Sequence, residues 1–225
     1  MTLDARVARR PARDESAAPP SADPTRAKLI AAAGEVFAER GYYTATVREI
    51  CLRAGVNIAA VNYHFRDKLG LYAEVLSAAV RSVQNAVPPA FEQHARSEDA
   101  LRAVIKVFMG RLYGRDHPSL PFRLMRHELV RPTPVLSQVV DEVMRPNYDR
   151  MRTIVGSLLG LPADHETTRS CVHSIMGQVI FYPYAAPVLA RLWPQLKMTP
   201  HRLSKIADHI ADFSLAYINR ARASA

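Results

Sequence analysis

The chain has 225 residues, of which 48% are hydrophobic and 23% are charged, a composition typical of a folded protein with one large domain or two small ones. Its formal net charge is +9, which favours a polyanionic partner, either nucleic acid or an anionic membrane surface, without choosing between them. The two cysteines form no disulfide framework, the first 24 residues lack a hydrophobic signal core, and no apolar stretch is long enough to span a bilayer, so we expect a cytoplasmic protein that does not enter the membrane.

The chain opens with an arm that has no helical or strand periodicity. Residues 1–23 are rich in Ala, Pro, Arg and Asp, and their opposite charges offset one another. This composition predicts a disordered arm; a basic arm that follows DNA is the alternative. Asp23-Pro24 then supplies a capping side chain and a proline, as helix starts often do, and Gly41 predicts the end of that helix. Its apolar face is formed by Leu29, Ala33, Val36 and Phe37.

Two short helices joined by a glycine turn follow. Thr46 and Glu49 form a capping box, S/T-x-x-E, which predicts the start of the first of them. Gly55 predicts its end, and Asn57 can cap the next helix, which we expect to end near His64. Three helices with a glycine turn within about 40 residues are typical of a helix-turn-helix unit.

The remainder of the chain also has helical periodicity. Asp67 caps a fourth helix, which we expect to reach towards Pro88. Further helices are predicted near residues 97–113, 119–130, 134–160 with an interruption at Pro146, 164–184 and 200–222. No segment alternates like a strand bounded by hairpin turns. The sequence therefore predicts an all-α fold, with an N-terminal three-helix helix-turn-helix unit followed by a helical bundle.

Several motifs stand in a fixed order along residues 25–72. They are Gly41-Tyr-Tyr-Thr-Ala-Thr-Val-Arg-Glu-Ile50, Ala54-Gly-Val-Asn57, Val61-Asn-Tyr-His-Phe65, and Asp67-Lys68 with Leu71-Tyr72. This set resembles the DNA-binding signature of TetR-type regulators. The rest of the chain is similar to a subgroup with a CecR-like (CerR) C-terminal domain, through Asn57-Ile-Ala-Ala-Val61, Arg126-His-Glu-Leu129 with Pro132-Thr-Pro134, and Val143-Met-Arg-Pro146.

The resemblance implies a ligand-responsive transcriptional repressor that is released from a palindromic DNA operator by a small molecule. We then divide the chain into a disordered arm, residues 1–23, a helix-turn-helix DNA-binding domain, residues 24–70, and a helical ligand-binding and dimerisation domain, residues 71–225. The third helix would lie in the major groove of the DNA, which is wide enough to admit one.

The family's DNA-contact positions correspond to nine residues of this chain: Thr46, Asn57, Ile58, Ala59, Ala60, Asn62, Tyr63, His64 and Lys68. Those with a hydroxyl or cationic side chain, together with the amide groups that begin the second helix at Thr46, suit phosphate oxygens because they donate hydrogen bonds. Base reading is left to the two asparagines, which can pair with adenine, and to the small apolar side chains, which can meet thymine methyls.

Two of these positions depart from the family pattern. Many relatives carry Lys or Arg where this chain has Ile58, and Gly where it has Ala59. Direct reading of guanine from that position is therefore not expected, and we predict half-sites whose centre favours A·T pairs.

Each contact residue also has a plain structural alternative. Tyr63 can be a core residue, as we expect Phe65 to be, and His64 can be an ordinary surface histidine. Lys68 on its own is a solvated charge. We interpret Arg48 as a solvated charge that pairs with neighbouring acids, Glu49 among them.

TetR-like proteins are dimers, and a two-fold DNA site needs two recognition helices about one helical turn apart. We expect a homodimer through the last two long helices, where Ser174 and Gly177 would permit close approach. The apolar face of the last helix contains Leu203, Ile206, Ala207, Ile210, Phe213, Ser214 and Tyr217. The alternative is that this face packs only inside its own subunit.

The resemblance also implies a cavity for a small apolar or amphipathic effector among the central helices. The candidates carry thioether, aromatic or isolated polar groups, as apolar-compound pockets do. They are Phe108, Met109, Met125, His127, Met144, Met151, His173, Met176, Gln178 and Tyr182. Each can instead be an ordinary core residue. Pro146 and Pro183 are expected to kink their helices, and the fourth helix is the expected lever between effector and DNA.

Other classes of protein have less support. The sequence lacks HExxH, a glycine-rich phosphate loop, G-x-S-x-G and CxxC, so we expect neither enzymatic activity nor a cofactor. His201, Asp208 and Asp212 can share a helix face, which we interpret as a solvated polar face and not as a metal site. The remaining alternative is an architectural or membrane-surface basic helical protein without sequence specificity.

Overall fold

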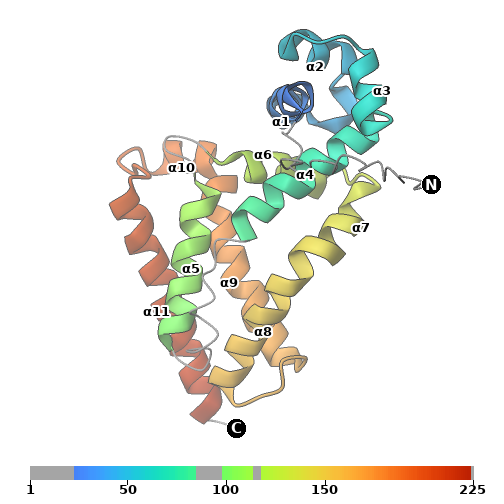
Figure 1. The fold of residues 1–225 in the computed structure, drawn as a ribbon. Coiled ribbons are helices and arrows are strands. Elements are labelled where there is room, and N and C mark those ends of the chain that lie inside the picture. Colours follow the sequence, from blue (N-terminus) through green and yellow to red (C-terminus); the bar gives the residue numbers. More distant parts are fainter. Residues whose placement is uncertain (1–22, 85–97, 114–117, 224–225) are drawn as a thin grey trace, which may run out of the picture.

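The computed structural model describes residues 23–84, 98–113 and 118–223, and it consists of helices apart from one isolated bridge between Tyr113 and Pro118. Figure 1 shows a small unit of three helices, α1 (Pro24–Thr44), α2 (Val47–Ala54) and α3 (Ala59–Phe65), standing on a longer bundle. The fourth helix, α4 (Lys68–Gln84), leads from one to the other. The predicted all-α fold is confirmed. Apart from Asp23, the predicted N-terminal arm lies outside the described residues.

The first helix begins and ends where the sequence predicts. The Asp23 carboxylate accepts a hydrogen bond from the amide of Thr25 (2.8 Å), which satisfies one of the donors that every helix start exposes. At the other end, Gly41 has φ 73° and ψ 167°, a conformation that side-chain-bearing residues avoid, and the chain turns there. The segment up to Thr44 therefore belongs to a kink and not to a regular helix.

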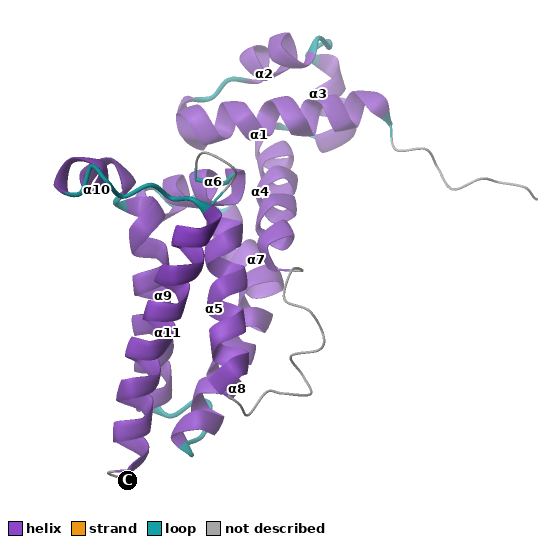
Figure 2. Ribbon diagram, turned by 90° about the vertical axis from the view of Figure 1, so that its left-hand side faces the viewer, coloured by secondary structure: helices purple, strands orange, loops and turns teal. Residues whose placement is uncertain are grey.

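The bundle is formed by α5 (Glu98–Leu112), α8 (Arg145–Leu159), α9 (Glu166–Tyr184) and α11 (Pro200–Ala223). Two shorter helices, α6 (Leu120–Val130) and α7 (Val135–Val139), lie between the bundle and the three-helix unit (Figures 1 and 2). The sequence did not predict α10 (Ala186–Leu192), which has no buried residue and stands off the end of α9 in Figure 2. Pro183 does not divide α9, which ends one residue later.

Two separate cores hold these elements together. The first core unites α1, α2, α3 and α4, through Leu29, Phe37, Ile50, Phe65 and Tyr72, with buried residues of α6 and α7. The second core lies among α5, α8, α9 and α11. Because α4 runs unbroken through residue 70 and packs in the first core, the boundary between the domains predicted there stays a prediction.

The predicted interruption in residues 134–160 lies just before Pro146 and not at it. Residues Val140–Met144 form a single π-helical turn, η2, and Pro146 lies in the first turn of α8. Proline has no amide hydrogen and cannot bond to the carbonyl four residues before it. A π-turn, in which the amide of Arg145 bonds to the carbonyl of Val140, shifts the hydrogen-bond register immediately upstream.

Candidate nucleic-acid interface, cavity and dimer face

The helix-turn-helix is defined by local caps on its two helices. Thr46 Oγ1 accepts a hydrogen bond from the amide of Glu49 (3.2 Å), as the capping box predicts. The second helix ends at Gly55, whose φ of 67° lies in the left-handed region that glycine adopts without strain. Asn57 Oδ1 then accepts a hydrogen bond from the amide of Ala59 (2.9 Å) and so begins α3. These contacts fix where α3 starts relative to α2.

The helix α3 has one buried and one exposed side. Val61 and Phe65 are buried in the first core. Ala60 is half-buried, and Tyr63 is 84% exposed, which removes the core alternative for that residue. The other predicted base-reading residues are exposed: Asn57, Ile58, Ala59 and Asn62. The exposed side therefore presents an amide, small apolar groups and a phenol, which are the groups that read base edges and contact phosphates.

The residues assigned to phosphate contact differ in accessibility. Thr46 is exposed at the start of α2, as is Tyr63 on α3. The His64 side chain is only 11% exposed, with its Nε2 atom 3.6 Å from a carboxylate oxygen of Asp23. The Lys68 ammonium lies 4.5 Å from the centre of the Tyr42 ring, and burial lowers the pKa of Lys68. His64 and Lys68 must leave these partners to reach a phosphate, whereas Thr46 and Tyr63 need not.

Two arginines beside the helix-turn-helix were not among the predicted contacts. Arg48 is exposed in the first turn of α2, and Glu49 forms its ion pair with Arg40 (Nε–Oε1 2.8 Å) and not with Arg48. Arg66 is exposed directly after α3 and is the one described non-glycine residue with positive φ, 70°. No periodicity points to Arg66, because it lies between the last turn of α3 and the Asp67 cap of α4 (Gly70 amide to Asp67 Oδ1, 2.8 Å).

A cavity of about 120 Å³ lies between α5, α8 and α9. Four of the ten predicted effector contacts line it: Phe108, Met144, Met151 and Met176. Further lining residues, which were not among the predicted contacts, are Val104, Asn147, Tyr148, Arg150, Ile154 and Val172. The wall is thus largely apolar, with polar groups supplied by a single turn of α8.

The other six predicted effector contacts lie away from this cavity. Met109 is fully buried in the second core, and Met125 packs against the first. His127 contacts α1, with its Nε2 atom 3.1 Å from the carbonyl oxygen of Ala38. His173 is exposed on α9, where it shares a hydrogen bond with the Tyr148 hydroxyl (3.0 Å). Gln178 and Tyr182 line hollows between α9 and α11.

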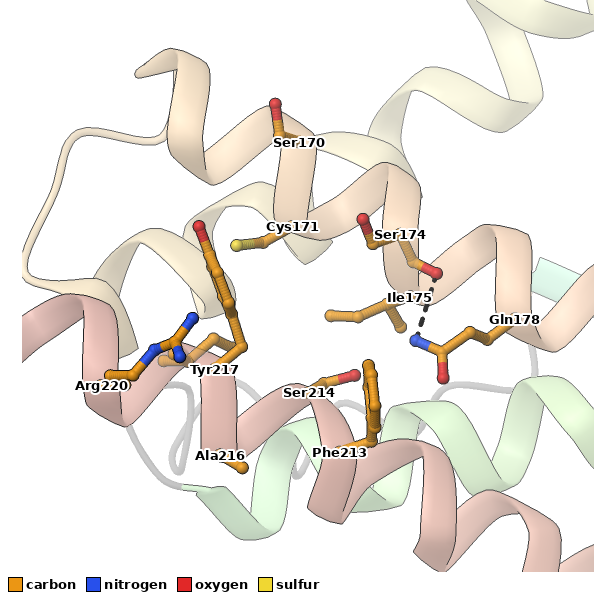
Figure 3. A pocket seen from close by; sticks show the side chains of 11 residues that line it. Ser170, Cys171, Ser174, Ile175, Gln178, Phe213, Ser214, Ala216, Tyr217 and Arg220 are labelled. Carbon is orange, nitrogen blue, oxygen red and sulfur yellow. Dashed lines mark hydrogen bonds between the residues drawn. The ribbon is translucent and has the colours of Figure 1, made fainter.

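The face formed by α9 and α11 carries a groove of about 640 Å³, shown in Figure 3. Cys171, Ile175 and Gln178 reach into it from α9, and Phe213 and Tyr217 reach into it from α11. The predicted apolar face of α11 is divided between two environments. Its residues Ile206, Ala207, Ile210 and Ser214 are buried within the chain, whereas Phe213 and Tyr217 remain 63% and 47% exposed. Both interpretations of that helix, internal packing and an outward apolar face, therefore apply to different residues.

The part of the chain that the structure describes has no group of His, Cys, Asp or Glu arranged to hold a metal ion, and none of its helices is long and apolar enough to cross a membrane. Two of the three polar residues that were expected to share one face of α11 pair with residues of α5. Asp208 and Asp212 form ion pairs with Lys106 (3.5 Å) and Arg102 (2.6 Å) of α5. These two ion pairs join α11 to α5.

A capped pair of short helices with an exposed second helix, carried on an all-helical bundle, is the architecture of helix-turn-helix DNA-binding regulators. Comparison with known families agrees. The model for bacterial regulatory proteins of the tetR family matches residues 29–75, and the model for the C-terminal domain of the HTH-type transcriptional dual regulator CecR matches residues 97–218, more than half of the chain. The protein belongs to the TetR family of transcriptional regulators, and its C-terminal domain is of the CecR type, as the sequence motifs predicted.

Individual relatives are also regulators. The HTH-type transcriptional activator FasR of Mycolicibacterium smegmatis is 35% identical over 118 residues, which span 52% of this chain and 52% of FasR. The dual regulator CecR of Shigella flexneri is 27% identical over 69% of this chain and 74% of its own length. Among solved structures, FadR from Bacillus subtilis, in complex with stearoyl-CoA, has the same fold, with a TM-score of 0.60 at 17% identity over 84% of this chain and 97% of FadR.

Proposed function

We propose that the protein is a transcriptional repressor that binds a palindromic operator as a homodimer and is released from it by a small apolar or amphipathic effector. The exposed side of α3 carries this proposal. Its side chains, Asn62 and Tyr63 above all, are not needed to build the core, and two caps hold the helix at a fixed register against its own domain.

In this proposal, base reading is done by Asn62 with the neighbouring Ile58 and Ala59. An asparagine amide can pair with adenine N6 and N7 in the major groove, and the two apolar side chains fit thymine methyls. The absence of a cation at these positions favours A·T pairs at the centre of each half-site. Each such pair should contribute about 1–3 kcal/mol of discrimination.

Phosphate contacts would fix the register of α3 in the groove. The exposed Tyr63 hydroxyl and the amide groups that begin α2 at Thr46 are accessible without rearrangement. Arg48 and Arg66 are exposed cations beside them and can add to the salt-dependent part of the affinity. For His64 and Lys68 we propose contact only after each leaves its intramolecular partner, Asp23 or the Tyr42 ring.

We propose that the homodimer forms on the groove between α9 and α11. Exposed Phe213 and Tyr217 give this groove an apolar floor, and exposed Ser174 and Gly177 on α9 allow a partner helix to approach closely. A copy of the same face can cover it by a two-fold axis. Such a dimer would present two α3 helices to successive major grooves.

The proposed effector site is the cavity lined by Phe108, Met144, Met151 and Met176. At about 120 Å³ it is smaller than an engineered cavity of about 150 Å³ that binds benzene, so a single small ring is the most that it could hold without rearrangement. A long acyl chain such as the one FadR carries would need a much larger space. We therefore propose that a larger effector enlarges the cavity, and that this movement is what changes DNA affinity.

The direction of regulation is part of the proposal. FasR is named an activator and CecR a dual regulator, so the family includes both outcomes. The direction of regulation can be tested with a reporter gene under the protein's own promoter, measured with and without the gene for this protein. If the protein is a repressor, deletion of its gene raises reporter output. Lower output on deletion would make the protein an activator.

A direct binding assay tests the whole proposal. The purified protein is titrated against its own upstream DNA and against scrambled DNA of equal length, at several salt concentrations, with and without a panel of one-ring aromatic compounds. If the protein is such a repressor, its affinity for one upstream site should be at least about a thousandfold higher than for scrambled DNA, and at least one compound should release it from that site. Equal binding to both DNAs would favour the architectural alternative, a basic helical protein without sequence specificity.

A further inference from the structure

The helix α6 lies between the three-helix unit and the bundle, and two of its consecutive residues contact different helices, α1 of that unit and the connecting helix α4. His127 lies against the end of α1, where its ring covers Gly41 and its Nε2 atom is 3.1 Å from the Ala38 carbonyl oxygen. Glu128 points towards α4 and is only 1% exposed. Burial of a carboxylate lowers the stability of the folded state unless the carboxylate is hydrogen-bonded, so the partners of Glu128 identify the segments that must lie beside it.

Both oxygens of the Glu128 carboxylate accept hydrogen bonds. The Tyr72 hydroxyl of α4 donates to Oε1 at 2.6 Å. Thr133, in the turn between α6 and α7, donates its hydroxyl to Oε1 at 3.0 Å and its backbone amide to Oε2 at 2.9 Å. One side chain thus joins α4, α6 and the start of α7. A bond of this kind to a charged acceptor is among the stronger ones in proteins.

The same network continues towards the cavity. The Thr133 hydroxyl also accepts a hydrogen bond from the amide of Val135, the first residue of α7 (3.3 Å). From there α7 continues through the π-turn η2 to Met144, which lines the cavity. Val139 and Val143 of this stretch are buried in the first core beside α4. A π-turn is a register shift that can be removed or moved, and such turns are frequent at functional sites.

We propose that Glu128 is the positioning residue that fixes the angle of the DNA-binding unit on the bundle, and that its bond with Tyr72 is what the effector breaks. Enlarging the cavity moves Met144 and the π-turn, α7 draws Thr133 with it, and Glu128 can then no longer reach Tyr72. The link is either made or broken, because a half-satisfied buried carboxylate is unfavourable. The effector step rests on the proposed function; the positioning role does not.

A purely structural role for Glu128 predicts something different. In that case removal of a hydrogen bond lowers the unfolding temperature and leaves the folded geometry alone. The positioning role predicts that the two parts of the folded chain change their relative orientation. A distance measured between them separates these two cases without any effector and without DNA.

The experiment uses the full chain with spin labels at Leu52→Cys on α2 and Ser157→Cys on α8, both exposed, in labelled chain diluted with unlabelled chain. The native thiols of Cys51 and Cys171 are buried. The distance distribution is measured for the parent and for Tyr72→Phe, Thr133→Val and Glu128→Gln. The matched control is Thr153→Val, which removes a hydroxyl bond of similar length (3.0 Å to the Asp149 carbonyl oxygen) within α8.

We expect one narrow distance in the parent and in Thr153→Val, and a broadened or second distance in all three link variants. Upstream-DNA affinity should fall in those variants by about two- to tenfold, because only the aligned fraction binds. The double variant Tyr72→Phe with Glu128→Gln should add little to either single change. An unchanged distance distribution in folded Tyr72→Phe and Thr133→Val overturns the positioning role, even if their unfolding temperatures fall. Failure of the parent to prefer its upstream DNA would instead count against the proposed function alone.

Discussion

Replacement of Gly41 by alanine should destabilise the protein through two separable effects. Gly41 has φ 73° and ψ 167°, which for a residue with a side chain costs about 1–3 kcal/mol. A Cβ atom there would also lie 2.9 Å from Nδ1 of His127, whose ring is held by its hydrogen bond with Ala38. Displacing the ring loses that bond, about 0.5–1.5 kcal/mol. We therefore expect Gly41→Ala to lower the free energy of unfolding by about 1.5–4.5 kcal/mol.

Gly55→Ala is the matched control. Its φ of 67° is also positive, but no atom lies within 4 Å of the position of its Cβ, so the expected cost is the backbone term alone, about 1–2 kcal/mol. Urea unfolding followed by circular dichroism gives both values. In the Gly41→Ala background, His127→Ala should remove the steric part and cost less than it does in the parent. Equal destabilisation by the two glycine substitutions, or additive effects of Gly41→Ala and His127→Ala, would refute this account of the junction.

Three further predictions concern the interface, the dimer and alkaline pH. Asn62→Ala should reduce discrimination at one base step by about 1–3 kcal/mol. Lys68→Ala should instead weaken binding to all duplexes alike and reduce the slope of log affinity against log salt concentration by about 1. Identical effects of the two variants would contradict the assignment of Asn62 to base contact and Lys68 to phosphate contact. Phe213→Asp should convert dimers to monomers in sedimentation without unfolding them, while Leu52→Asp, an exposed change far from the groove, should not; a dimeric Phe213→Asp would move the interface elsewhere. Burial, and then the bond to Glu128, raise the pKa of Tyr72 well above its usual value near 10. The stabilisation that the neutral Tyr72 hydroxyl gives the folded state is therefore complete below pH 10 and is lost as the pH rises above it. The fall in the free energy of unfolding at alkaline pH should be shallower in Tyr72→Phe, and an unchanged slope would contradict this role of Tyr72.

The features that the sequence predicts well are those set by local chemistry. Thr46, Asn57 and Asp67 cap their helices as predicted, because each accepts a hydrogen bond from an amide two or three residues along the chain. Gly41 and Gly55 turn the chain where predicted, because both have positive φ. The helix-turn-helix and the all-α class follow from these local signals, and so does the exposure of Asn62.

The features that the sequence misses depend on contacts between distant segments. The ten predicted effector contacts carry thioether, aromatic or polar groups, but residue type does not say which of the two cores a side chain joins: Met109 is buried in the second core, and Met125 packs against the first. The partner of His64 is Asp23, 41 residues earlier, and Lys68 lies over the ring of Tyr42, and neither contact can be read from local sequence. The π-turn lies just before Pro146, in a stretch whose Val139 and Val143 are buried in the first core, and the proline alone does not define its place.

Selection of duplexes from a random DNA pool tests whether the exposed side of α3 reads DNA sequence. The protein and its Asn62→Ala variant are each taken through several rounds, and the recovered sequences are compared. We predict that the parent enriches two inverted half-sites about one helical turn apart, with A·T pairs at their centres, and that the variant loses preference at one base step in each half-site. Recovery of no shared sequence, or of the same sequence by both proteins, would mean that the exposed side of α3 does not read DNA.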